Sequence, residues 1–163
     1  MVYFAYGSNM CSGRLRRRVP SAVPLFVAAL RSYRFHFHKR SLDGSSKADA
    51  FRTGNGNDVV WGVVFRIEER EKPQLDEAEA SGYEQQSVDV TDEEGNAHSA
   101  LLYVAAASHI DGLLQPYTWY KRFVVEGARQ HRLPEPYVAV VEREAAIEDP
   151  DRERHARNIA ITC

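Results

Sequence analysis

The sequence predicts an α+β fold in which helices flank a mixed, barrel-like β-sheet, built as a single domain over residues 1–163. Strand-like segments are interspersed with amphipathic helical ones, a pattern that favours a mixed class over an all-helical or all-strand one. A chain of 163 residues with 44% hydrophobic residues is long enough for one core. We find no internal repeat, low-complexity tract or linker that would divide it.

The first predicted strand covers residues 2–6, where aromatic and small side chains alternate. Three further segments are rich in β-branched or aromatic residues and are predicted strands: 29–38, 59–67 and 100–105. The second contains "VWGVVFRI", which is nearly uniformly apolar, as is typical of a strand buried on both faces near the middle of a sheet. The intervening "RSLDGSSKADAFRTGNGND" predicts a long loop, and "DEEGN" predicts a hairpin turn.

A short amphipathic helix is predicted over residues 10–19, because Leu15 and Val19 lie four positions apart among arginines. Ser8 or Asn9 occupies the position of an N-cap. The order of elements at the start of the chain is therefore strand, turn and helix.

Two more helices follow from the spacing of apolar residues, one around Leu75 and one after Pro116 that ends near "HRLPEPY". The apolar positions of the second helix are Tyr117, Tyr120, Phe123, Val124 and Ala128. About the last fifteen residues are strongly charged, and we expect them to form a partly loose tail.

Composition restricts the classes of partner and the location. A formal net charge of −2 gives no global field for nucleic acid or an anionic membrane, so neither is an expected partner. The chain starts without a leader pattern, and no apolar run approaches the roughly 18 to 20 residues of a membrane span, so we expect a cytoplasmic protein. Cys11 and Cys163 form neither a disulfide framework nor a zinc site by spacing, and both are predicted free thiols.

The opening motif "YFAYGSNM" runs from an aromatic strand directly into Gly7, Ser8 and Asn9. A turn of this kind exposes backbone amides that can bind an anion, and glycine permits a close approach of the backbone. An ordinary capped helix is the alternative, because capping is the commonest use of serine and asparagine. The turn alone is a weak signal.

The whole motif resembles the signature of the γ-glutamylcyclotransferase family, in which it forms the loop that holds the γ-glutamyl group. Further segments resemble the family in the same order: "RL", "PSA", "DGSSKADA", "VWGVVF", "LDEAEA", "GAR" and "LPEPY". The resemblance covers nearly the whole chain. It implies the family fold, a small-molecule γ-glutamyl substrate, no metal or organic cofactor, and release of 5-oxoproline together with a free amine or amino acid. It also implies that the backbone amides of Gly7, Ser8 and Asn9 hold the substrate α-carboxylate.

In the family, the acid two positions after "LDE" is the general base, which here is Glu79. Without the resemblance, the acids of this stretch indicate only a solvated helix face. The reaction needs a group that takes a proton from an α-amine of pKa about 8 and gives one to the departing amine. An ordinary carboxylate matches that amine poorly, so we expect Glu79 to be shielded from water. Burial or the negative charge of Asp76, three residues earlier, would raise its pKa.

The resemblance assigns Tyr83, four residues after Glu79, and Tyr120 to contact with the substrate; an ordinary core role is about as common for such tyrosines. Tyr6 is included among the substrate-binding residues, although a structural role is commoner at its position. Ala80 stands where many relatives have glycine, and the Glu79–Tyr83 segment is short. Both differences affect the leaving-group preference more than the chemistry.

Three other patterns have simpler interpretations. His36 and His38 share a strand face but lack a third metal ligand, which favours a polar face. Ser8 and Cys11 are candidate acyl-transfer nucleophiles without a G-x-S-x-G elbow or a nearby histidine.

The basic run "RLRRR" favours an exposed helix face over phosphate binding. Within it, Arg14 is a candidate partner for a substrate carboxylate, and Lys47 in "SSKA" is expected to shape the loop around the site.

Three functions therefore remain open before the structure. The leading one is a γ-glutamylcyclotransferase acting on a γ-glutamyl amino acid, peptide or amine, with Glu79 as general acid and base. The second is a binding module on the same fold without turnover, and the third is an acyl hydrolase. The sequence does not distinguish a monomer from a homodimer, nor does it select the leaving group.

Overall fold

The computed structural model describes residues 1–79 and 82–163. At its centre lies a closed barrel whose strands follow the order β1-β5-β2-β6-β7. Neighbouring strands are antiparallel, except that β1 and β7 close the barrel in parallel. The barrel strands are β1 (Val2–Ala5), β2 (Val23–Arg31), β5 (Val59–Arg66), β6 (Tyr83–Asp92) and β7 (Ala97–Ala105). The predicted mixed, barrel-like sheet is confirmed.

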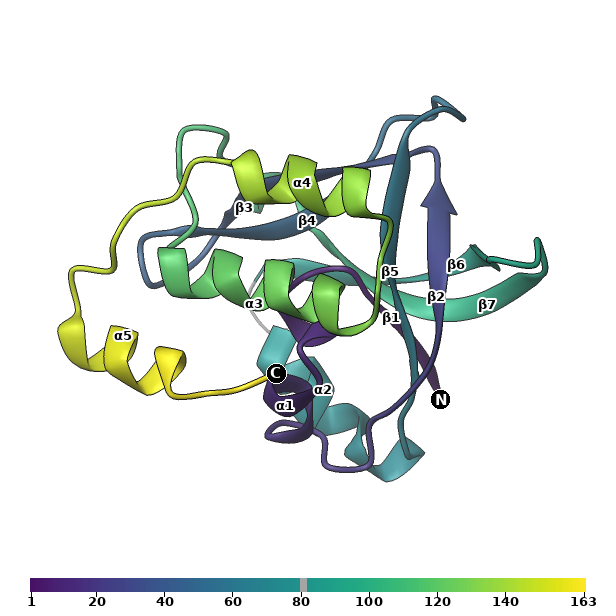
Figure 1. Ribbon diagram of the computed structural model, residues 1–163, viewed down its shortest axis with the longest axis horizontal. Helices are drawn as coiled ribbons and strands as arrows, with labels where there is room; N and C mark the ends of the chain where they lie inside the picture. The colour runs from purple at the N-terminus through teal and green to yellow at the C-terminus, as the bar shows by residue number, and fades with distance from the viewer. Residues whose placement is uncertain (80–81) are drawn as a thin grey trace.

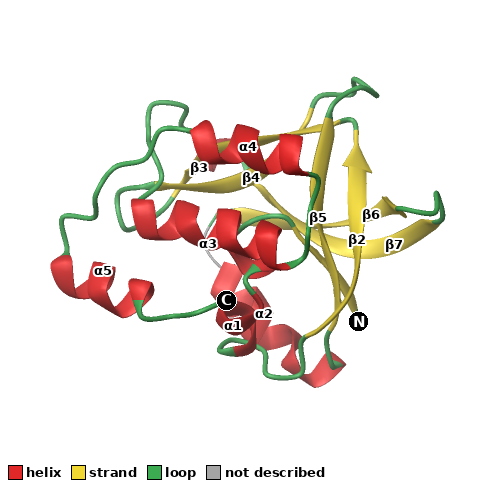
Figure 2. Ribbon diagram, viewed as in Figure 1, coloured by secondary structure: helices red, strands yellow, loops and turns green. Residues whose placement is uncertain are grey.

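A separate two-stranded sheet and several helices surround this barrel. The sheet pairs β3 (Tyr33–Arg40) with β4 (Ser46–Arg52). The α-helices are α1 (Ser12–Arg16), α2 (Lys72–Glu79), α3 (Thr118–Gln130), α4 (Glu135–Arg143) and α5 (Arg152–Ile159), and the 3-10 turns are η1 (Ser8–Met10), η2 (Glu69–Glu71) and η3 (Ala107–His109). In Figure 1, α3 and α4 lie side by side, and α5 lies on the opposite side of the molecule from the β6–β7 hairpin. Figure 2 shows the helices gathered at one side of the barrel.

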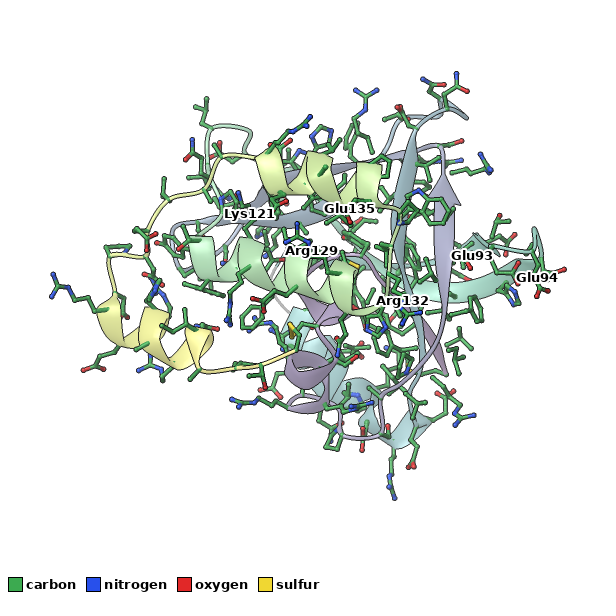
Figure 3. The ribbon with its side chains drawn as sticks, in the orientation of Figure 1. Glu93, Glu94, Lys121, Arg129, Arg132 and Glu135 are labelled. Carbon is green, nitrogen blue, oxygen red and sulfur yellow. A yellow bond between two sulfur atoms is a disulfide. The ribbon has the colours of Figure 1, made fainter. Side chains whose placement is uncertain are left out.

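The apolar segment 59–67 forms β5, which lies between β1 and β2 as its composition predicts. Its residues Val63, Val64 and Phe65 are at most 1% exposed, as is typical of a strand buried on both faces. The hairpin turn at "DEEGN" is also confirmed, and it joins β6 to β7. Glu93 and Glu94 stand at its tip, far from the helices (Figure 3).

The sequence prediction missed one turn and one strand in this part of the chain. The predicted strand 29–38 is two strands, β2 and β3, separated by a turn at Ser32, whose φ of 67° lies in the left-handed region. The predicted long loop contains β4. Asp49 gives this strand a polar appearance, yet it is buried, because its carboxylate accepts hydrogen bonds from the Ala105 amide at 2.7 Å and pairs with His38 at 2.7 Å.

The helices follow the predicted spacing with three differences. Residues around Leu75 form α2, and the stretch after Pro116 forms α3. The helix predicted over residues 10–19 is shorter and covers Ser12–Arg16. The residues before it, Ser8–Met10, form the 3-10 turn η1, so neither Ser8 nor Asn9 caps α1. A further helix, α4, begins at "EPY", where we expected the chain to leave its helix. Finally, α2 ends at Glu79, so that Tyr83 begins a strand.

The charged C-terminal segment is ordered, contrary to the prediction of a loose tail. Asp149 anchors it: this buried carboxylate accepts hydrogen bonds from Trp119 of α3 at 2.8 Å and from Arg154 of α5 at 2.7 Å. The Arg154 guanidinium holds the pKa of Asp149 well below its usual range. Asp151 caps α5 by accepting the Arg154 amide. A buried, fully paired acid therefore fixes a segment whose composition resembles a tail.

The prediction of two free thiols is wrong, because Cys11 and Cys163 form a disulfide across a sequence separation of 152 residues. The fold brings the C-terminal end of the chain against the start of α1, where a Cβ at Gly13 would lie 2.1 Å from the Thr162 carbonyl oxygen. Figure 1 shows the C-terminus beside α1. Among the described helices, none is long and apolar enough to cross a membrane.

Candidate active site

A pocket opens where β1 ends and the chain enters η1. We call it the tyrosine pocket, because five tyrosines contribute to its wall. Its lining residues are Tyr3, Tyr6, Gly7, Ser8, Asn9, Ala48, Glu79, Tyr83, Tyr103 and Tyr120. All seven residues that the sequence assigned to the site line this pocket, although they come from four separate parts of the chain.

Glu79 is the last residue of α2, and its side chain is only 14% exposed. Its Oε1 accepts a hydrogen bond from Asn9 Nδ2 at 2.5 Å, and Arg18 Nη1 lies 3.6 Å away. Burial raises the pKa of Glu79, although Arg18 and Asn9 act in the opposite direction. The expected shielding from water is therefore present, and the carboxylate is biased toward accepting a proton.

Asp76 does not share the environment of Glu79, although both are on α2. Its carboxylate pairs with Lys72 at 2.7 Å, accepts a hydrogen bond from the Tyr103 hydroxyl, and is 45% exposed. Of the two causes considered for a raised pKa of Glu79, burial is the one that the structure supports.

The side chain of Asn9 holds Glu79 in place, a role that the sequence analysis missed. Its Nδ2 donates to Glu79 and to the Tyr3 hydroxyl at 3.0 Å, while its Oδ1 accepts from Arg18 Nη1 at 2.9 Å. Asn9 is 3% exposed, so each of these bonds is protected from water. The prediction for Asn9 concerned only its backbone amide, because the position of Glu79 beside it depends on the fold.

Tyr83 and Tyr120 both bind the backbone of Ala48 on β4. The Tyr83 hydroxyl donates to the Ala48 carbonyl at 2.6 Å, and the Tyr120 hydroxyl accepts the Ala48 amide at 3.1 Å. Burial raises the pKa of both tyrosines, so both hydroxyls keep their protons. Because Tyr120 accepts from Ala48, its own hydrogen is available for another acceptor.

Tyr6 and Gly7 shape the pocket more than they offer polar groups to it. The Tyr6 hydroxyl donates to the Tyr103 carbonyl at 2.5 Å, which joins β1 to β7. A Cβ at Gly7 would lie 3.1 Å from the Ala48 Cβ, so only glycine lets the turn approach β4 without displacement. A similar close approach at Gly127 of α3, where a Cβ would lie 2.4 Å from the Cys11 amide, packs that helix against η1.

Tyr3 and Tyr103 were not predicted as site residues. The Tyr3 hydroxyl accepts a hydrogen bond from Asn9, and the Tyr103 hydroxyl donates one to Asp76. The available signal was the general one that a tyrosine in a buried strand needs a partner for its hydroxyl.

The basic run "RLRRR" is not one exposed helix face. Arg16 and Arg17 are exposed, but Arg14 and Arg18 turn toward the site. Arg14 donates to the Ser8 hydroxyl at 3.3 Å and to Asn158 of α5 at 3.2 Å. The helical spacing of four residues explains why these two arginines share a side.

The remaining candidates of the sequence analysis lie elsewhere or are engaged. His36 and His38 stack on β3, and among the described residues no group of three or more His, Cys, Asp or Glu side chains could hold a metal. Cys11 is not available as a thiolate nucleophile in the disulfide form. Lys47 pairs with Asp43 at 2.6 Å. The expectation that concerned Ala80 lies outside the described residues.

Comparisons with known proteins agree with this fold and pocket. The AIG2-like family model matches residues 59–141. A γ-glutamylcyclotransferase of Homo sapiens is 32% identical over 148 residues, which cover 83% of this chain and 74% of that protein. The protein of the same name from Mus musculus is 32% identical over 144 residues, with the same coverage.

Solved structures extend the likeness over nearly the whole chain. A γ-glutamyl cyclotransferase superimposes with a TM-score of 0.85 at 26% identity and covers 98% of both chains. An uncharacterized protein of Homo sapiens gives a TM-score of 0.82 at 27% identity, over 96% of this chain and 97% of that one. Fold and family model together define an AIG2-like protein. The chain belongs to the γ-glutamylcyclotransferase family of enzymes.

Proposed function

We propose that the protein converts a γ-glutamyl compound into 5-oxoproline and a free amine or amino acid, with Glu79 as general acid and base. The observation that carries this proposal is the setting of Glu79, a shielded carboxylate of raised pKa at the wall of a narrow pocket formed mainly by uncharged hydroxyl, amide and aromatic groups. A carboxylate of this kind suits proton transfer to and from amines better than an exposed one does.

The reaction needs no external nucleophile, because the substrate carries its own. The α-ammonium group releases one proton to solvent, and Glu79 takes a second as the nitrogen attacks the γ-carbonyl carbon and closes a five-membered ring. The bond between the γ-carbon and the leaving nitrogen breaks as Glu79 returns the proton to that nitrogen. One carboxylate therefore serves both transfers, and general acid and base catalysis of this type contributes about 10² to 10⁴-fold.

The rest of the tyrosine pocket would hold the substrate folded back on itself. The family resemblance assigns the α-carboxylate to the backbone amides of Gly7, Ser8 and Asn9, which line the wall next to Glu79. Tyr120, whose hydroxyl hydrogen is available, would donate to a substrate oxygen. Tyr83 would form another part of the pocket wall, and its hydroxyl would hold Ala48 in place by donating to the Ala48 carbonyl. Correct orientation of an internal nucleophile is itself a large part of the acceleration.

The test is the formation of 5-oxoproline, followed by mass spectrometry, from a panel of γ-glutamyl dipeptides, γ-glutamyl amines and glutathione. Wild type, Glu79→Gln and the matched control Glu77→Gln are compared, since Glu77 is an exposed acid on the same helix. We expect wild type and Glu77→Gln to form product at similar rates and Glu79→Gln to be slower by about 10² to 10⁴-fold.

Two results would contradict the proposal. Product formation that persists in a folded Glu79→Gln would remove Glu79 from the mechanism. Binding of γ-glutamyl compounds by wild type without any product would instead favour the binding module considered from the sequence.

A further inference from the structure

The part of the pocket wall that β4 contributes is a stretch of backbone. Ala48 is 2% exposed, and pocket tyrosines bond to both of its backbone groups: Tyr120 to the amide at 3.1 Å and Tyr83 to the carbonyl at 2.6 Å. The positions of these two hydroxyls therefore depend on where the Ala48 backbone lies. Its methyl side chain has no polar group that could fix this backbone, so neighbouring residues have to fix it.

The ladder between β3 and β4 is interrupted next to Ala48. Phe37 pairs with Ala48 and Lys39 pairs with Lys47, so His38 is an extra residue on the β3 side. A bulge of this kind disrupts the backbone pairing locally and redirects the side chain of the extra residue. The sheet ladder therefore holds Ala48 less firmly than a regular pairing would.

Asp49, the next residue of β4, bonds in two directions. It is 1% exposed; its Oδ1 accepts the Ala105 amide at 2.7 Å, and its Oδ2 lies 2.7 Å from His38 Nε2. Because successive side chains of a strand point to opposite faces, and the Ala48 methyl group faces Gly7, the Asp49 carboxylate lies on the face away from the tyrosine pocket. Both carboxylate oxygens are bonded, as a buried charge requires.

These contacts close a ring around the pocket wall. Ala105 of β7 pairs in register with Tyr83 of β6, and the Tyr83 hydroxyl donates to the Ala48 carbonyl. Asp49 follows Ala48 in the chain and binds Ala105, so each of these four residues holds the next. A displacement of the Asp49 carboxylate would therefore reach both the start of β6 and the Ala48 backbone.

His38 fixes the orientation of the Asp49 carboxylate. Its side chain is 13% exposed and stacks on His36, with ring centroids 4.9 Å apart, while the edge of Phe51 meets it at 5.9 Å. Its backbone carbonyl accepts the Asp111 amide at 2.7 Å. Because neighbours hold both the ring and the backbone of His38, its Nε2 stays beside Oδ2 of Asp49.

We propose that Asp49, oriented by His38, is a positioning residue that holds the Ala48 backbone and, through it, the Tyr83 and Tyr120 hydroxyls in the arrangement that ring closure needs. This inference rests on the proposed function and adds to it a residue outside the pocket. Ring closure by an internal nucleophile depends on orientation, and a displacement of about 1 Å can cost about 10²-fold in rate. A carboxylate suits this role because a charge-assisted hydrogen bond holds a backbone amide more strongly than a neutral one.

The first experiment measures kcat and KM for γ-glutamyl-alanine in wild type, Asp49→Ala, Asp49→Asn and Asp92→Ala. Asp92 is a matched control at the β6–β7 turn, because it also pairs with a histidine, His98 at 2.7 Å, and accepts a backbone amide, that of Asn96 at 2.8 Å. We expect Asp49→Ala to lower kcat by about 10- to 100-fold with little change in KM, and Asp92→Ala to resemble wild type. Asp49→Asn keeps an oxygen for the Ala105 amide and should recover most of the rate. A folded Asp49→Ala with the wild-type kcat would overturn the proposal.

A double-mutant cycle with Tyr83→Phe tests whether Asp49 acts through the ring of contacts. Adding Asp49→Ala to Tyr83→Phe should slow the reaction by a factor at least about threefold smaller than adding it to wild type, because the supported contact is already lost. Fold-changes that simply multiply would contradict the proposal. If Asp49→Ala does not fold, His38→Leu takes its place in the cycle with the same expectation, and His98→Leu is its matched control.

Hydrogen exchange of the Ala48 amide separates this inference from the reaction, because it needs no substrate. We expect this amide, measured relative to that of Val64 in the core strand β5, to exchange at least about tenfold faster in Asp49→Ala or His38→Leu than in wild type or Asp92→Ala. That result supports the positioning role even if wild type forms no 5-oxoproline. Product formation by wild type with unchanged Ala48 exchange in the variants would retain the proposed function and overturn this inference.

Discussion

The two faces of β4 serve the tyrosine pocket in opposite ways. On the side of the pocket, the uncharged hydroxyl groups of Tyr83 and Tyr120 bond to the Ala48 backbone. On the side away from it, the buried carboxylate of Asp49 binds the Ala105 amide. The difference separates two tasks: uncharged groups contact a substrate without adding a charge to the pocket, whereas a buried charge gives the stronger bond that fixes a backbone.

The largest expected effect concerns the C-terminal segment, which bonds to Arg14 through Asn158. The Cys11–Cys163 disulfide holds the end of that segment. Cys163→Ser should lower the free energy of unfolding by about 2–4 kcal/mol, because the bond closes a very long loop. Urea unfolding measures this loss. This change in global stability is the reference for the local changes at β4.

Thiol labelling before and after reduction supplies the control for that prediction. Without reductant we expect neither cysteine to label, and after reduction we expect both to label. A native protein that labels at both cysteines without reductant would contradict the disulfide.

A smaller effect is expected on the pocket side of β4. Tyr120→Phe leaves the buried Ala48 amide without its acceptor, which should cost about 1–3 kcal/mol of stability. It should also slow every substrate by a similar factor, roughly tenfold or more. The matched control is Tyr137→Phe, a tyrosine on α4 that does not line the tyrosine pocket. An equal loss of rate in Asp49→Asn would break the distinction between the two faces of β4.

The pH dependence of stability tests whether the Glu79 carboxylate is buried. The pKa of Glu79 is raised in the folded state, so the stability associated with its protonated form is fully present below the unfolded pKa. That stability is lost as pH rises through the raised pKa. Glu79→Gln has no proton to release there, so its Tm should rise relative to wild type across this window. Scanning calorimetry of both proteins from pH 4 to about pH 8 measures the difference, and a constant difference would contradict burial of the charge.

The wild-type rate should change in the opposite sense over the same window. Because the proposed mechanism needs the Glu79 carboxylate as a base, kcat/KM should increase as pH rises through the raised pKa. A rate that falls over this range would exclude the carboxylate as the base.

The smallest effect is expected for a surface charge that does not line the tyrosine pocket. Arg129 of α3, labelled in Figure 3, pairs with Glu142 of α4 at 2.8 Å, and each side chain is 48% exposed. Arg129→Ala should lower stability by about 0.2–1 kcal/mol, an effect that salt reduces. The rate of 5-oxoproline formation should stay as in wild type. A loss of rate as large as that of Asp49→Ala would show that charge removal acts without regard to position.

The accuracy of the sequence-based predictions depended on how local each feature is. The apolar run of β5 and the spacing of α3 identify their elements because a strand or helix has a fixed period. The turn at Ser32 was missed because serine seldom adopts a positive φ, so the residue type gives no warning. The strand β4 was missed because aspartate is typical of loops, and the partners that let Asp49 be buried, Ala105 and His38, are distant in the chain.

For the site, the motif "YFAYGSNM" and the acid Glu79 predict the chemistry, because the family resemblance links residues that are distant in the chain. The sequence by itself thus determined the class of enzyme, the periodic elements and seven of the ten lining residues of the tyrosine pocket. Only the tertiary structure decided that Asn9 binds Glu79, that Arg14 and Arg18 turn inward, and that Cys11 meets Cys163. The physical reason is that hydrogen bonds, charge balance and a disulfide depend on distances between atoms, and residues far apart in the chain acquire those distances only when the barrel closes.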